Sequence, residues 1–81
     1  MLIRYVDEAT GLKTFYERRL QSLPMPPLPK IGEHVALPRK AEDIPTPAPG
    51  IAVATHDFYS VVGVNHYVAE DRVEVFLRGP V

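Results

Sequence analysis

The distribution of proline along the chain restricts the fold more than any other feature of the sequence. Eight of the nine prolines lie between residues 24 and 50, and the ninth is Pro80. Proline has no backbone N–H and a fixed φ angle, so it interrupts helices and is confined to the ends and edges of strands. The chain therefore divides into two proline-free segments, 1–23 and 51–79, and a proline-rich segment, 24–50, that can contain only a short strand.

The length of 81 residues predicts a single domain, spanning residues 1–81, with one thin core. A domain of this size buries only about 60% of the surface that its unfolded chain exposes, which leaves no room for a two-domain enzyme or a nucleotide-binding α/β sheet. The sequence contains no cysteine, which excludes a disulfide framework, a thiolate zinc site and a cysteine nucleophile. No apolar run approaches the roughly 18 residues of a membrane span, and the N-terminus has no signal-peptide layout. We therefore expect a cytoplasmic protein without a membrane partner.

The C-terminal segment carries the clearest strand signals. In residues 73–78 the apolar Val73, Val75 and Leu77 alternate with Glu74 and Arg78, as in a half-buried strand. Residues 58–68 are rich in β-branched and aromatic side chains. Residues 69–72 between them suit a four-residue hairpin loop. With that loop, the pairs expected on the core face are Val68–Val73, His66–Val75 and Val64–Leu77. The pairs expected on the other face are Tyr67–Glu74, Asn65–Phe76 and Gly63–Arg78.

Strict alternation fails upstream of Val64 in the first strand of this hairpin. It would place Val62 in the core, although Val61 and Tyr59 are the better apolar pair. One extra residue at Val62-Gly63, a β-bulge, would return that pair to the core face, and glycine is a residue that bulges favour. We therefore expect a bulge there that bends the strand, as small barrels require.

The proline-rich segment contains one strand-like stretch, residues 33–37, which Pro38 ends. Residues 24–30 contain P-x-x-P motifs, but no basic residue lies at the spacing that a polyproline ligand needs, so we interpret them as a stiff crossover. Residues 38–50 predict an exposed loop. Residues 51–55 are apolar and β-branched enough to form a strand or to merge with the next one.

The first segment has two interpretations. Apolar and aromatic side chains between residues 12 and 22 fit helical spacing, with Thr10 as a cap. Alternatively, Asp7–Gly11 forms a hairpin turn that ends in a left-handed glycine, between strands at 2–6 and 12–18. A glycine suits the end of a turn better than the first turn of a helix, so the hairpin is favoured and a helix at about 12–22 is the alternative.

Together these elements predict an all-β fold, a small, partly open barrel or roll of four to six short antiparallel strands. An α+β fold with the helix at 12–22 is the alternative. The run 29–38, the strand 73–77, and the positions between them resemble short uncharacterised bacterial proteins with SH3-like β-barrels. Those intervening positions are Tyr59, Val61, Val64 and His66. The resemblance covers about half the chain and implies a fold but no activity.

No group of residues predicts catalysis or metal binding. His34, His56 and His66 match no metal-ligand spacing, and His66 falls on the predicted core face as a hydrogen-bonded structural residue. Neither serine lies in a nucleophile-elbow pattern, and the isolated glycines form no phosphate-binding loop. The paired acids lie in predicted turns, which lack the burial that raises a carboxyl pKa. We therefore expect no enzyme activity, no metal and no cofactor.

Nucleic-acid binding is the alternative function. Residues 1–40 carry seven bases and four acids, whereas residues 41–81 carry two bases and six acids. A basic first hairpin would interleave cations with aromatic rings that can stack on bases. Its candidate residues are Arg4, Tyr5, Lys13, Phe15, Arg18 and Arg19. The overall charge of −1 gives no long-range attraction to phosphates.

Protein–protein interaction is the preferred function. Asn65, Tyr67, Glu74 and Phe76 are expected on the outer face of the C-terminal hairpin, where aromatic side chains favour an interface. Alternatively, the first hairpin or the proline-rich segment covers Phe76 and makes it part of a second small core. The sequence thus predicts a non-catalytic binding or assembly module whose partner is another protein or a second copy in a homodimer.

Overall fold

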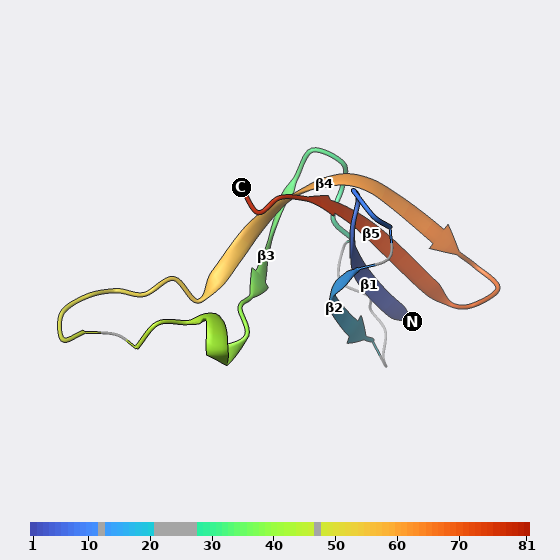
Figure 1. The fold of residues 1–81 in the computed structure, drawn as a ribbon. Coiled ribbons are helices and arrows are strands. Elements are labelled where there is room, and N and C mark those ends of the chain that lie inside the picture. Colours follow the sequence, from blue (N-terminus) through green and yellow to red (C-terminus); the bar gives the residue numbers. More distant parts are fainter. Residues whose placement is uncertain (12, 21–27, 47) are drawn as a thin grey trace.

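A computed structural model describes residues 1–11, 13–20, 28–46 and 48–81. In these residues the fold is all-β, with five strands and no α-helix (Figure 1). The elements are β1 (Leu2–Asp7), β2 (Thr14–Arg19), β3 (His34–Pro38), the 3-10 turn η1 (Ala41–Asp43), β4 (His56–Tyr67) and β5 (Arg72–Arg78). The predicted all-β class is confirmed, and no helix in the described ranges is long and apolar enough to cross a membrane.

The five strands form one sheet, in the order β2-β1-β5-β4-β3, that curls into a small, nearly closed barrel. Three of the four strand pairs are antiparallel, and the pair β1–β5 is parallel. A parallel pair needs a long crossover, which the chain between β1 and β5 supplies. β2 and β3, the two ends of the sheet, are not paired with each other, but the ring of Phe15 on β2 lies 4.8 Å from the ring of Tyr59 on β4, centroid to centroid. We call this opening, bridged by the two rings, the seam.

The core lies on the concave face of the sheet. The most deeply buried side chains, each 2% exposed or less, come from β4 and β5. They are Val61, Val73, Val75 and Leu77. The alternation predicted for residues 73–78 is therefore confirmed. Ile3, Leu37 and Tyr59 complete the cluster and bring β1, β3 and the start of β4 into the same core.

The predicted bulge in β4 is present. The register between β4 and β5 shifts between Val61 and Gly63, so that Val61 lies opposite Leu77 and Gly63 lies opposite Phe76. Tyr59 and Val61 are both buried, as a bulge at this place requires.

The hairpin loop was predicted one residue too late. β4 ends at Tyr67, opposite Arg72, so the loop comprises residues 68–71. Asp71 closes it, because its φ of 51° is left-handed and its N–H donates to the carbonyl of Val68 at 3.3 Å. The pairing is thereby displaced by two residues, which leaves each residue on its predicted face. Val68 itself is 88% exposed rather than in the core.

The structure also corrects the prediction for His66. This residue lies opposite Val73 in the register, yet its side chain is exposed. At this end of the hairpin the core includes Val73 on β5, which pairs with Ile3 on β1, but it does not extend to His66 on β4. His66 is therefore not the buried structural histidine that the alternation indicated.

The first segment forms the hairpin β1–β2, and the alternative helix at 12–22 is wrong for the residues that the structure describes. Gly11 ends the turn with a φ of 66°, and its N–H donates to the carbonyl of Asp7 at 2.8 Å. This is the left-handed glycine that the sequence predicted. Leu12 and residues 21–27, which include most of the proposed crossover at 24–30, lie outside the described residues.

The connection between β3 and β4, residues 39–55, projects from the barrel (Figure 1). We call it the arm. Two interactions fix the base of the arm. The backbone N–H of Arg39 donates to the carbonyl of Thr55 at 2.9 Å, and the guanidinium of Arg39 forms an ion pair of 2.8 Å with the carboxylate of Asp57. The exposed loop predicted at 38–50 is confirmed for most of its described residues. The strand predicted at 51–55 is wrong, because strand pairing begins only at His56.

Gly79 provides a test of the backbone beyond β5. Its φ is 141°, and a Cβ atom there would lie 3.0 Å from the nitrogen of Val81 and 3.2 Å from Cδ1 of Tyr59. We expect Gly79→Ala to lower the free energy of unfolding by about 1–3 kcal/mol, as measured by urea denaturation. Gly63→Ala, which would make only ordinary van der Waals contacts, is the control. Equal losses in the two variants would contradict this account.

Candidate functional site

The four residues predicted for protein binding lie on one face of the C-terminal hairpin. Asn65 is opposite Glu74, and Tyr67 precedes the loop two residues further along the same strand. Phe76 lies two residues beyond Glu74 on β5, opposite Gly63. Because side chains two residues apart on a strand share a face, the four side chains form one row of neighbours. We call this surface, together with Arg72 and with Arg4, which pairs with Glu74 from β1, the hairpin face.

Charge on the hairpin face is balanced. Glu74 lies between two arginines, with Oε2 3.6 Å from Arg4 on β1 and 3.7 Å from Arg72. The guanidinium of Arg72 also lies 4.2 Å from the centre of the Tyr67 ring, a cation–π contact. Arg4 makes a second ion pair, of 2.8 Å, with Glu17 on β2. These contacts link side chains from four strands, β1, β2, β4 and β5.

The ring of Phe76 is half-buried. The opposite residue is Gly63, so no side chain on β4 lies directly across from the ring, and the nearest Phe76 atom is 3.5 Å from where a Cβ of residue 63 would be. On its other side Phe76 is paired with Val6, which is almost fully buried. Phe76 thus combines a packed edge with an accessible one.

Sequence reasoning missed Arg4 and Arg72 as members of this site. Arg4 was assigned instead to the basic first hairpin, and its approach to Glu74 depends on the parallel pairing of β1 with β5. No local pattern signals a parallel neighbour that lies 70 residues away in the chain. Arg72 was placed in the hairpin loop, and the correct register moves it opposite Tyr67.

The residues predicted for nucleic-acid binding do not form one surface. Arg4 lies on the outer face in ion pairs, whereas Tyr5 and Tyr16 lie side by side with ring centroids 6.2 Å apart. Lys13 and Phe15 lie at the seam, where the Lys13 ammonium is 5.4 Å from the Phe15 ring centre. Arg18 and Arg19, being adjacent on β2, point to opposite faces.

A concavity of about 230 Å³ opens at the seam, beside the base of the arm. Phe15 and Tyr59 lie among its apolar lining, and Lys13, Arg39 and Asp57 lie among its charged lining. Burial raises the pKa of the Tyr59 hydroxyl above its ordinary value, and Asp57 raises this pKa further, while Arg39 opposes the shift. The concavity thus combines aromatic and charged groups.

The raised pKa of Tyr59 makes stability depend on pH in the alkaline range. A folded-state pKa above the unfolded value means that the folded protein holds this proton more tightly. The resulting stabilisation is fully present below the unfolded pKa of about 10 and is lost as pH rises through the folded pKa. We expect Tyr59→Phe to lose less stability than wild type as pH rises above about 10. Urea denaturation across this range measures the difference, and parallel losses in both proteins would contradict it.

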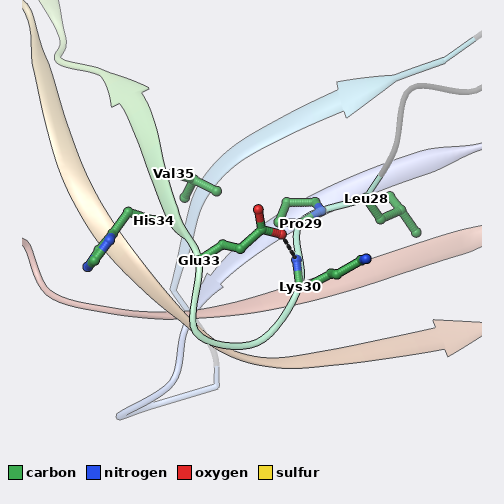
Figure 2. Close-up of a pocket in the computed structure, with 6 residues that line it drawn as sticks. All are labelled: Leu28, Pro29, Lys30, Glu33, His34 and Val35. Carbon is green, nitrogen blue, oxygen red and sulfur yellow. Dashed lines mark hydrogen bonds between the residues drawn. The ribbon is translucent and has the colours of Figure 1, made fainter.

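A second concavity, of about 390 Å³, lies at the turn before β3 (Figure 2). The carboxylate of Glu33 accepts a hydrogen bond from the Lys30 backbone N–H at 2.6 Å and thereby closes the turn. Figure 2 shows that His34 points away from the Lys30 side chain, so the two do not converge on a common point. This concavity is a consequence of the turn rather than an assembled site.

The three histidines lie apart, at the start of β3, the start of β4 and the end of β4. Among the residues that the structure describes, no three histidine or acidic side chains come together in a group that could hold a metal ion. The expectations of no metal, no cofactor and no catalysis stay predictions. No protein-family model, curated protein or solved structure matches the chain.

Proposed function

We propose that the protein is a non-catalytic binding or assembly module that recognises a partner protein through the hairpin face. The observation that carries this proposal is that Asn65, Tyr67, Glu74 and Phe76 occupy one side of the two paired strands. Tyrosine and arginine are among the residues that dominate the energy of protein interfaces, and phenylalanine is enriched in them.

The charge balance of the hairpin face favours a protein over a nucleic acid as the partner. Arg4 and Arg72, its cations, already contact Glu17 and Glu74. Phosphate binding would have to displace these carboxylates, whereas an apolar protein surface can cover the rings and leave the ion pairs at the rim intact. Nucleic-acid binding by the first hairpin stays a prediction, and it would require a salt-sensitive affinity for single or double strands.

The proposal extends to the class of barrel. We propose that this barrel is SH3-like, on the basis of its five strands, its strongly bent β4 and the run 29–38 that leads into β3. Small barrels of this kind present binding surfaces on a rigid scaffold, as the hairpin face would.

The experiment compares proteins recovered from the native cell extract by tagged wild type and by the double variant Tyr67→Ala, Phe76→Ala. Central aromatic residues each contribute about 2 kcal/mol or more to an interface, so the double variant should recover the specific partner at least about tenfold less. Phe58→Ala is the matched control, because Phe58 is a 54% exposed aromatic on β4 outside the hairpin face.

A second variant separates loss of binding from loss of folding. Asn65 is exposed, so Asn65→Arg adds bulk and charge to the hairpin face without removing packed atoms. It should unfold at the same urea concentration as wild type and still lose the partner. Recovery of the same proteins by wild type, the double variant and Asn65→Arg would overturn the proposed function.

A further inference from the structure

The outer edge of β2 carries backbone groups without a strand partner. β2 is at one end of the sheet, with β1 as its sole neighbour among the strands of the described chain (Figure 1). Met1 and Leu20 exchange two hydrogen bonds, of 2.9 and 2.8 Å, at the end of this pair. Hydrogen bonding alternates along an antiparallel strand, so Arg18 also directs its N–H and C=O toward β1. Glu17 and Arg19 therefore direct theirs away from β1, toward the open edge.

We propose that two copies of the chain associate by antiparallel pairing of their β2 edges, about a twofold axis at Arg18. In this register Glu17 of each copy lies opposite Arg19 of the other. The outward N–H and C=O groups of these two residues then make four hydrogen bonds between the copies. The partner of this surface is a second copy of the chain, and the pairing joins two five-stranded sheets into one.

Charge selects this register over its neighbours. Glu17 lies on the outer face beside Arg4, and Arg19, two residues along the strand, shares that face. Only alternate residues direct their backbone groups toward the open edge, so the neighbouring registers differ from this one by two residues. These registers would place Glu17 opposite Glu17 or Arg19 opposite Arg19. Like charges directly opposite each other destabilise a strand pair, and opposite charges stabilise it. The proposed register is thus the one that forms two cross-strand ion pairs.

The inner face of the same edge supplies apolar contact. Tyr16, which is 40% exposed, would lie opposite Leu20 of the second copy on each side of the axis. The two Arg18 side chains would meet at the axis, so they oppose the association. This proposal does not depend on the hairpin face, but it would place two copies of that face on one continuous outer surface.

Charged residues on an edge strand can also serve to prevent pairing with other chains. The two roles predict opposite results. Protective charges leave the protein monomeric at every concentration, and removing them promotes association. Complementary charges make association depend on the sign of each residue, and like charges introduced at either position weaken it.

Sedimentation equilibrium over a range of concentrations measures the association. Wild type should form dimers, and Glu17→Lys and Arg19→Glu should each weaken dimerisation by at least about tenfold, because each change makes two opposite-charge pairs like-charged. An equimolar mixture of these two variants should dimerise again, since each heterodimer restores both ion pairs. Arg18→Thr should dimerise more tightly than wild type, and Lys30→Glu, an exposed charge reversal outside β2, should match wild type.

Two results would overturn the proposal. One is a wild type that stays monomeric up to about 1 mM, where even an association of about 4 kcal/mol would be visible. The other is a dimer whose strength is the same in wild type, Glu17→Lys and Arg19→Glu. Tyr67→Ala, Phe76→Ala should leave this dimer unchanged, so failure of the β2 pairing and failure of the hairpin face are separate outcomes.

Discussion

Replacing Leu77 with alanine should remove about 3 kcal/mol from the free energy of unfolding. Leu77 is fully buried at the centre of the core, on the strand that pairs with both β1 and β4. Removing a buried leucine side chain costs about 2–5 kcal/mol, because the cavity that it leaves is only partly filled. Domains of this size have about 0.05–0.15 kcal/mol of stability per residue, so the variant should lose a large fraction of the total.

Urea denaturation, monitored by circular dichroism, measures this loss. The urea concentration at the midpoint should fall, while the dependence of the unfolding free energy on urea concentration stays unchanged. Val68→Ala is the control, because Val68 is of similar character but 88% exposed in the hairpin loop. The free energy of unfolding of this variant should stay within about 0.5 kcal/mol of the wild-type value. A Leu77→Ala variant as stable as Val68→Ala would show that the core is not where we describe it.

Tyr59→Ala should be about as destabilising, by roughly 3 kcal/mol, for a different reason. Tyr59 is one of the core residues, and its ring also contacts Phe15 across the seam at 4.8 Å. Its removal therefore creates a cavity and also separates β2 from β4. Aromatic pairs contribute about 0.5–1.5 kcal/mol beyond their buried area.

A double-mutant cycle isolates the contact across the seam. The variants are Tyr59→Ala, Phe15→Ala and the two together, with stability measured by urea denaturation. We expect a coupling free energy of about 1 kcal/mol between the two rings. Additive losses would mean that the barrel is held at the seam by something other than this aromatic pair.

Local patterns in the sequence predicted the elements that depend on local physics. Alternation of apolar and charged residues identified β5, and the break in alternation near Gly63 predicted the bulge at the correct place. Gly11 distinguished a hairpin from a helix, because only the turn needs a left-handed residue there. In each case the element depends on residues within a few positions of the pattern that predicts it.

Features that depend on distant partners were not predictable in this way. The position of the hairpin loop is a local exception: it was misplaced because Asp71 takes the left-handed conformation that closes the loop, and an aspartate signals that conformation less clearly than a glycine does. The exposure of His66 depended on where the core ends, which alternation alone does not indicate. The parallel pairing of β1 with β5 left no local signal, so the approach of Arg4 to Glu74 emerged only from the structure.

The candidate site shows the same division. The hairpin brought together the four residues chosen from the sequence, because a displacement by two residues preserves the face of each one. The basic first hairpin did not gather its six residues, because alternation sends neighbours to opposite faces and a bulge at Tyr5/Val6 changes the pattern again. Clustering in sequence is thus a weak guide to clustering on a sheet.

Hydrogen exchange of the backbone amides, measured with and without the bound partner, tests the hairpin face most directly. The method reports which segments a partner covers, and so it does not depend on the effect of any substitution. Our account predicts that binding slows exchange chiefly in residues 63–76, with the arm and β3 unchanged. Protection confined to the arm, or to β3 and the turn before it, would contradict the account.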